Sequence, residues 1–271
     1  MRHWYRKYSI TSIDDRDIGT IRCCETYWPQ RPEGAGQNPV TSEETTNPEQ
    51  ETERLKRELA FLQKKFLVVG SITRHDILNQ MTAIMGYNEL LLTMVSDEKQ
   101  RSFLEIERRA TEKIRRVFAY SKVYGNIGAE PPRWQKLDAL VHLACDEVNL
   151  GTARIQQDTR CSLLADPQVV KAFAYLFDNA VRHGKRTTVI TLSLQQGSDN
   201  FILSVSDDGE GIPGSDKERI FERGYGKYTG WGLFVAREIL AAGGMSIRET
   251  GSAGKGARFE ITIPDASLRL E

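Results

Sequence analysis

Two long helical patterns joined by a short turn set the strongest limit on how this chain folds. The first pattern runs from Gly70 to a turn at Ser96-Asp97-Glu98, and the second from about Lys99 to Tyr124. This spacing predicts an antiparallel helical hairpin. A lone hairpin cannot enclose a core, whereas two copies form a four-helix bundle. We therefore expect a homodimer through the helices of residues 51–126. The apolar stripe of the first helix consists of Ile77, Met81, Ile84, Asn88 and Leu91, flanked by Leu78, Met85 and Leu92.

A heptad-like seam precedes the hairpin. Its residues step by four, three, four and three, which favours a coiled coil, with one amphipathic surface helix as the alternative. Strict continuation of the seam would place Asp76 on it, so the phase must shift between Val69 and Ile77. We interpret this shift near Gly70 as a candidate signalling switch. The seam consists of Leu55, Leu59, Leu62, Phe66 and Val69.

The flanking segments differ in composition. Residues 29–50 are rich in Pro, Gly, Ser, Thr and Glu and have almost no large apolar side chains, which predicts a disordered linker. Residues 1–28 are expected to be a loose leader, with the end of a sensor domain as the alternative. From 133 to 271 helices alternate with strands, which predicts an α/β sandwich with one sheet and helices on one face. The expected helices are 137–149, 167–183 and 231–243, and the expected strands are 187–194, 201–206, 245–250 and 257–263.

Composition excludes several classes of function. The 271 residues carry 37 basic and 37 acidic side chains, so no positive excess favours nucleic acid or an anionic membrane. No apolar run approaches the roughly 18 residues of a membrane helix, and no signal-peptide core follows the basic N-terminus. The four cysteines include the adjacent pair Cys23-Cys24 and form no CxxC pair, which argues against a zinc site or disulfides. We expect a cytoplasmic protein without direct membrane insertion.

His75 is the candidate catalytic residue of the hairpin. At 100° per residue it lies about 130° from the centre of the apolar stripe, on the outer face, which Asn79 shares. Asp76 can accept a hydrogen bond from one imidazole nitrogen and leave the other as a nucleophile. Asn79 is placed to orient a water beside a phosphorylated His75. A plain surface histidine is the alternative interpretation.

Two polar signals in the α/β part favour a nucleotide. Asn179 lies in an apolar helix expected to begin at Asp166-Pro167, and its amide oxygen can complete a Mg²⁺ shell made mostly of phosphate and water. Arg182 and His183, one turn later, can reach phosphates. The second signal, Asp207-Asp208-Gly209-Glu210-Gly211-Ile212, follows a strand; its first carboxylate can accept the exocyclic amine of adenine, and its glycines admit a flat base.

Three glycine-rich signals follow in order. Phe221 precedes the stretch Gly224 to Thr229, which includes Lys227. Gly230-Trp231-Gly232-Leu233 opens a helix, whose free N–H groups and dipole favour a phosphate. Gly254-Lys255-Gly256 leads into the last strand. Each signal alone is an ordinary glycine turn, but their shared order is not expected by chance.

From His75 to the C-terminus, the chain resembles the kinase core of two-component sensor histidine kinases. His75-Asp76 with Asn79 matches the phosphoacceptor box, and Asn179 matches the asparagine box. The glycine and phenylalanine boxes are matched by Asp207, Gly209, Gly211, Phe221, Gly230, Gly232, Gly254 and Gly256.

This resemblance implies a division of the chain and a reaction. Residues 1–50 would be the N-terminal segment and linker, 51–70 a signalling helix, 71–126 the dimerisation and histidine phosphotransfer domain, and 133–271 a GHKL-type, or Bergerat, ATP-binding domain. The fold class would be α+β. The family uses ATP with Mg²⁺, phosphorylates the histidine, and passes the phosphoryl group to an aspartate of a response regulator receiver domain. In this chain Arg182, His183 and Lys227 would neutralise phosphate charge, and Ile212 and Leu233 would contact the nucleotide.

The chain departs from the family pattern at several positions. Tyr175 stands where Asn is frequent, Gln80 where Pro is usual, and Trp231 where Leu is usual, and the lid between Phe221 and Gly230 is short. Two alternatives therefore stay open beside the kinase: a non-catalytic or phosphatase-dominant dimeric scaffold, and another GHKL-type ATPase. The upstream His75 argues against the second alternative.

Overall fold

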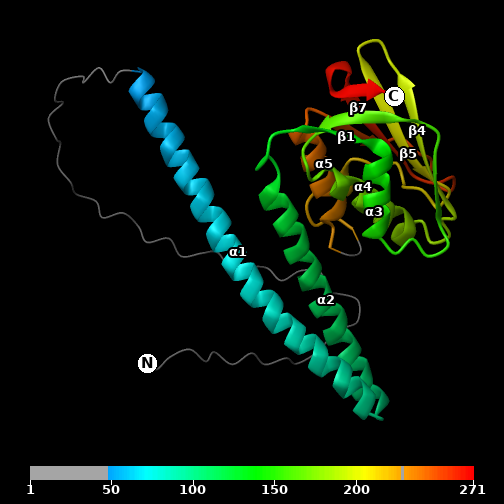
Figure 1. Ribbon diagram of the computed structural model, residues 1–271. Helices are drawn as coiled ribbons and strands as arrows, with labels where there is room; N and C mark the ends of the chain where they lie inside the picture. The colour runs from blue at the N-terminus through cyan, green and yellow to red at the C-terminus, as the bar shows by residue number, and fades with distance from the viewer. Residues whose placement is uncertain (1–47, 227–228) are drawn as a thin grey trace. The chain divides into compact units, whose positions relative to one another are not determined.

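The computed structural model describes residues 48–226 and 229–271, with some side chains of the first helix left out (Figure 1). The expectations for residues 1–47, including Cys23-Cys24, and for Lys227 lie outside these residues. The side chains of Phe66 and Val69 are also outside the description.

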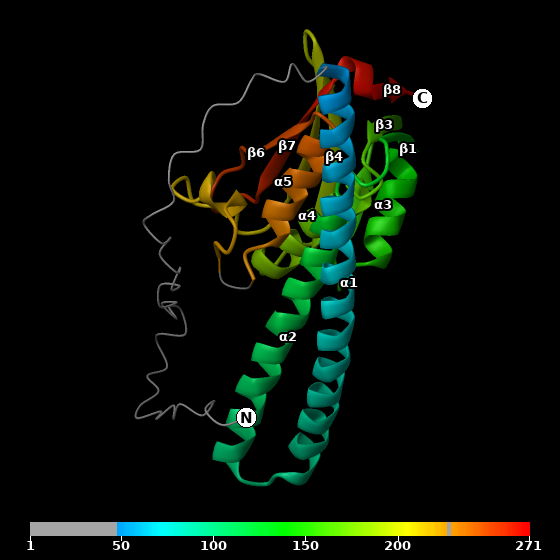
Figure 2. The same cartoon turned by 90° about the vertical axis from the view of Figure 1, so that its left-hand side faces the viewer.

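The helical hairpin has the expected form. Helix α1 spans Pro48–Met94 and continues through Gly70 without a break, and α2 spans Glu98–Asn126 (Figure 2). Asp97 caps α2 by accepting a hydrogen bond from the Gln100 backbone N–H at 2.8 Å.

The two helices of the hairpin are joined by a small buried seam. Met81 and Asn88 are buried, and the Asn88 Nδ2 donates to the Leu104 carbonyl at 3.0 Å. By contrast, Ile84 and Leu91 of the predicted stripe are 45% and 44% exposed. One apolar face of α1 therefore remains uncovered within a single chain.

The C-terminal part contains two sheets, where the sequence predicted one. The five-stranded sheet has the order β2-β4-β5-β7-β6, and the three-stranded sheet has the order β1-β3-β8. The missed strands are three to five residues long, and three of them lack a run of large apolar residues. Their bounds are β1 Arg133–Lys136, β2 Arg154–Gln157, β3 Cys161–Ala165 and β8 Leu268–Leu270. The predicted strands are β4 Val189–Gln196, β5 Asn200–Asp207, β6 Ser246–Glu249 and β7 Arg258–Pro264.

Three helices cover one face of the five-stranded sheet (Figure 1). They are α3 Leu137–Asp146, α4 Val169–His183 and α5 Gly232–Ala242, accompanied by the short 3-10 helices η1 Arg219–Phe221 and η2 Asp265–Ser267. The alternating burial of β7 turns Phe259, Ile261 and Ile263 into the core beneath the helices. This core fixes α4 and α5, which carry the predicted site residues.

The start of α4 differs from the prediction. The helix begins at Val169, two residues later than expected, because the buried Asp166 carboxylate stabilises a turn that precedes the helix. Its oxygens accept hydrogen bonds from the backbone N–H groups of Gln168 and Gly128, each at 2.7 Å. Asp166 thus ties the segment after α2 to the start of α4.

Candidate active site

His75 lies on α1 with its ring open to solvent. Its side chain is 73% exposed, and its Nδ1 lies 3.4 Å from Asp76 Oδ1 and 3.3 Å from Asn79 Nδ2. Only one of the two neighbours can bond a given form of the ring, since a protonated Nδ1 donates to Asp76 and an unprotonated Nδ1 accepts from the Asn79 amide. With the proton on Nδ1 and donated to Asp76, the Nε2 lone pair is the one free to attack a substrate.

The ATP-binding candidates meet at a cavity of about 810 Å³ in the C-terminal part. A cavity of this size suits a nucleotide-sized ligand. Its walls come from α4, from the loop after β5, from the segment before α5 and from α5 itself. The predicted residues that line it are Asn179, Arg182, His183, Gly211, Ile212, Gly230, Gly232 and Leu233.

Part of the wall of this cavity is polar and suits phosphates. Asn179 lines it, and its side-chain amide has no hydrogen-bond partner among the described residues. Arg182 Nε lies 2.5 Å from Asp178 Oδ1, and Lys185 Nζ lies 2.8 Å from Glu210 Oε2. An unpartnered amide oxygen beside several cations fits a magnesium–phosphate group.

Another part of the wall is the loop after β5. Gly211 has φ +69°, and a Cβ there would lie 2.5 Å from the Ser252 carbonyl oxygen, so only glycine fits. Asp207 Oδ1 accepts hydrogen bonds from the N–H groups of Gly209 at 2.9 Å and Ala257 at 3.2 Å. Burial raises the pKa of Asp207 above its usual value.

Three predicted residues do not line the cavity in this structure. Asp207 and Gly209 belong to the strand end and loop next to the lining residues Glu210 and Gly211, and Phe221 is buried at the end of η1. The Phe221 ring meets Phe259 edge-on at 6.3 Å between centroids. Phe221 therefore anchors the start of the lid in the core.

The segment before α5 is shaped by glycines. Gly224 donates its backbone N–H to the Gly230 carbonyl at 2.9 Å, and Gly230 has φ +63°. A Cβ at Gly230 would lie 2.3 Å from the Gly224 backbone, so the turn needs glycine. This turn delivers the chain to the N-terminus of α5 at the cavity.

Residues of α2 also reach the cavity, and the sequence motifs did not indicate them. Tyr120 and Tyr175 meet edge to face at 5.0 Å between ring centroids, and Tyr120 is hydrogen-bonded to Thr229. Burial raises the pKa of both hydroxyls. The departure from Asn at Tyr175 was the sequence signal that could have pointed to this contact.

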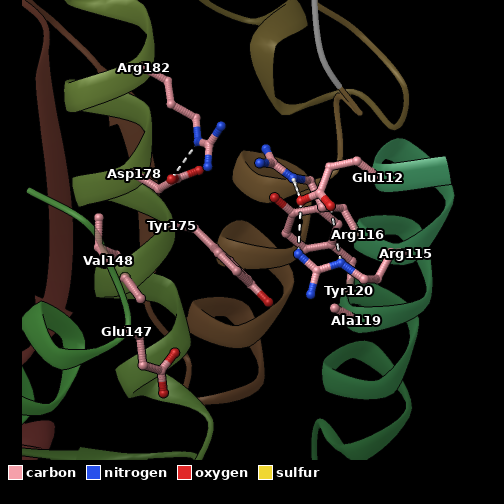
Figure 3. A pocket seen from close by; sticks show the side chains of 11 residues that line it. Glu112, Arg115, Arg116, Ala119, Tyr120, Glu147, Val148, Tyr175, Asp178 and Arg182 are labelled. Atoms are coloured by element: carbon pink, nitrogen blue, oxygen red, sulfur yellow. Dashed lines mark hydrogen bonds and ion pairs between the residues drawn. The ribbon is translucent and has the colours of Figure 1, made fainter. Parts of the chain in front are cut away.

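A smaller cavity of about 250 Å³ adjoins this contact between α2 and α4 (Figure 3). Its walls carry balanced charge, because Glu112 pairs with Arg115 at 2.8 Å and with Arg116 at 3.4 Å, and Asp178 pairs with Arg182. The Arg115 guanidinium is the main cause of the lowered pKa of Glu112. The paired charges favour an interface over an anion site.

Asp208 binds the segment at the start of β4 through its carboxylate. Its Oδ1 accepts from the N–H groups of Thr188 at 2.7 Å and Val189 at 3.1 Å, and its Oδ2 accepts from the Thr188 hydroxyl at 2.5 Å. These hydrogen bonds, with that of the Thr188 hydroxyl first, lower the pKa of Asp208 to about 2.

Because Asp208 is exposed and solvent screens its charge, we expect Asp208→Asn to lower the free energy of unfolding by no more than about 1 kcal/mol at pH 7. Because folding lowers this pKa, the contribution is full above the ordinary value of 3.8 and is lost as the pH falls toward 2. Urea unfolding between pH 7 and pH 3 should show the difference from wild type shrinking below about pH 4. The exposed Asp199→Asn is the matched control, and a difference independent of pH would contradict this account.

The ATP-binding fold is matched by a family of known proteins. Residues 165–267 match the family described as Histidine kinase-, DNA gyrase B-, and HSP90-like ATPase. The full-length ShkA structure, in complex with AMPPNP, aligns with a TM-score of 0.52 at 18% identity, covering 74% of this chain and 46% of that one. The fold and the cavity therefore define an ATPase domain of this class, preceded by a helical hairpin.

Sequence relatives narrow the class further. The sensor histidine kinase AruS of Pseudomonas aeruginosa is 30% identical over 223 residues, which cover 72% of this chain and 22% of that protein. Sensor histidine kinase Hik2 of Thermosynechococcus vestitus is 26% identical over 218 residues, covering 70% and 57%. The chain is therefore similar to the kinase core of two-component sensor histidine kinases. The chain spans 22% and 57% of the lengths of these two relatives. Among the described residues, no helix has the length and apolar character needed to cross a bilayer.

Proposed function

We propose that this chain is an ATP-dependent protein-histidine kinase that phosphorylates its own His75 and passes the phosphoryl group to an aspartate of a response regulator. The observation that carries the proposal is the exposed His75, whose Nδ1 lies beside the Asp76 carboxylate while Nε2 has no hydrogen bond among the described residues. A plain surface histidine has no need of this arrangement. The nucleotide-sized cavity in the same chain would hold ATP, the phosphoryl donor.

In the proposed reaction, Asp76 holds the proton on Nδ1 and so presents the Nε2 lone pair. Nε2 attacks the γ-phosphorus of ATP; the N–P bond forms while the P–O bond to ADP breaks, and ADP leaves with the electron pair. The Asp76 carboxylate stabilises the positive charge that develops on the ring.

The cavity residues would bind and orient ATP. Arg182 and His183 at the end of α4, with Lys227 of the lid, would neutralise phosphate charge. Asn179 is the residue that would hold Mg²⁺, and the ion would supply neutralisation of the charge on the phosphates. Ile212 and Leu233 offer apolar surface to the base, and the Asp207 carboxylate would accept its exocyclic amine.

A homodimer is part of the proposal because Ile84 and Leu91 are exposed on one face of α1, seven residues apart.

We expect the double variant Ile84→Glu/Leu91→Glu to shift the chain to monomer at micromolar concentration, since each buried apolar side chain contributes roughly 2 kcal/mol. Light scattering after size exclusion measures this. Thr82→Glu, on the opposite face of α1, is the control and should stay dimeric. A monomeric wild type would refute the dimer.

A second candidate function is dephosphorylation of the partner. The Asn79 amide lies 3.3 Å from the His75 ring, where it can position a water against a phosphorylated receiver. Loss of phosphatase activity in Asn79→Ala with His75 labelling retained would favour this role.

Phosphotransfer profiling tests the main proposal. Wild-type chain labelled from γ-labelled ATP is mixed with a panel of receiver domains, and label should move to one of them within minutes. The receiver variant that lacks the acceptor aspartate should receive none. Label that never leaves the chain for any receiver would argue against a two-component kinase.

A further inference from the structure

Glu249, at the end of β6, is a buried carboxylate that the proposed mechanism does not use. Its side chain is 0% exposed. Oε1 accepts hydrogen bonds from the backbone N–H groups of Gly251 at 2.9 Å and Arg258 at 3.1 Å. Oε2 has no hydrogen bond among the described residues, but it lies 3.0 Å from Lys217 Nζ in an ion pair.

Lys217 joins two segments through this ion pair. It lies between the loop after β5 and η1, and its Nζ also donates to the Gly251 carbonyl at 2.5 Å. A buried ion pair is weak evidence for stability, because apolar replacements of both partners are often neutral or stabilising. Because this ion pair links the segment before η1 to the start of the loop after β6, we expect it to fix the conformation of that loop.

The loop that Glu249 closes, residues 251–257, packs directly on Asp207. Gly256 has φ +102°, and a Cβ there would lie 1.8 Å from the Asp207 carbonyl oxygen. Ala257 donates its N–H to Asp207 Oδ1 at 3.2 Å and accepts the Asp207 N–H at 2.9 Å. Any shift of this loop therefore moves the Asp207 carboxylate.

The same loop also holds the cavity wall. Gly254 donates its N–H to the Glu210 carbonyl at 2.6 Å, and Gly211 is in close contact with the carbonyl oxygens of Ser252 and Gly256. Asp207 Oδ1 is occupied by the two backbone donors, whereas Oδ2 has no hydrogen bond from the described residues. Oδ2 is the oxygen left for a ligand.

We propose that Glu249 and Lys217 are positioning residues for recognition of the base: they fix the 251–257 loop so that Asp207 presents Oδ2 to the exocyclic amine of adenine. This inference rests on the proposed binding of ATP. The pair acts through Asp207 and does not touch the nucleotide. The pair also fastens the segment before η1 to the loop that sets the base site.

The test uses the full chain and compares two ligands, ATP and the triphosphate of purine riboside, which lacks the 6-amino group. Lys217→Met alone would leave a buried unpaired carboxylate, so the informative variant is Glu249→Gln/Lys217→Met, which removes both charges and keeps the shapes. Arg248→Gln is the matched control. Arg248 precedes Glu249 on β6, and this change breaks its ion pair with Glu260 of β7. Urea unfolding confirms that each variant is folded.

Wild type should bind ATP more tightly than the analogue. In the double variant we expect the Kd for ATP to rise about tenfold and the Kd for the analogue to change less than twofold, because only the contact to the amine is lost. Arg248→Gln should keep both values, and Lys217→Arg should keep most of the preference for ATP.

Three results would overturn the inference: an unchanged preference in the double variant, an equal weakening of both ligands, or a wild type that does not prefer ATP. The last result would leave the kinase proposal standing if His75 still takes label from ATP. A wild type that binds neither ligand would overturn both proposals.

Discussion

His75→Gln should abolish incorporation of label from γ-labelled ATP into the chain. Glutamine keeps a polar side chain on the exposed face of α1 but has no nitrogen lone pair that can attack phosphorus. Since His75 has no packing role and is 73% exposed, the variant should fold and bind ATP as wild type does. Labelling should therefore fall to background while the Kd for ATP stays within twofold.

His142→Gln is the matched control for this experiment. His142 is also an exposed histidine on a helix, and its Nδ1 lies 2.8 Å from the Asp138 carbonyl oxygen, remote in sequence from the phosphoacceptor motif. This variant should label like wild type. Equal labelling of His75→Gln and wild type would refute the assignment of the phosphoacceptor.

Asn179→Ala should reduce labelling of His75 by roughly a hundredfold or more. A residue that holds the metal at the phosphates contributes several kcal/mol to the transition state for phosphoryl transfer. Asn179 lines the large cavity, and its amide has no partner among the described residues, so its removal should cost the fold little. The initial rate of labelling at saturating Mg²⁺ and ATP measures the effect.

Asn149→Ala serves as the control for Asn179→Ala. Asn149 is an exposed asparagine of the same domain, whose Oδ1 accepts from the Gly151 N–H at 3.1 Å in a turn outside the cavity. Its labelling rate should stay near that of wild type. A rate in Asn179→Ala within threefold of wild type would remove Asn179 from the metal site.

The helices were predictable because their signals are local. The apolar period of α1 and α2 and the turn at Asp97 lie within one stretch of chain, and the observed hairpin follows them closely. The glycine motifs were equally local, and two of their glycines, Gly211 and Gly230, have positive φ in the structure. The arrangement of Asn179, Arg182 and His183 on one turn of α4 followed from the helix period alone.

What the sequence missed depends on contacts between distant segments. The three-stranded sheet pairs β1 with β3 and β3 with β8, and such short strands give no period of their own. The contact of Tyr120 with Tyr175 joins α2 to α4 across 55 positions, and the Glu249–Lys217 pair joins β6 to the segment before η1. Burial and partners decide these roles, and residue type alone does not reveal them.

The position and chemistry of the phosphate on wild-type chain test the central claim most directly. After incubation with ATP and Mg²⁺, tandem mass spectrometry of the peptide that contains His75 should find a single phosphate on that histidine. The phosphate should be lost in acid and survive in base, as a phosphoramidate is. An acid-stable phosphate on a hydroxyl side chain, or ATP bound without any phosphate on His75, would contradict the account.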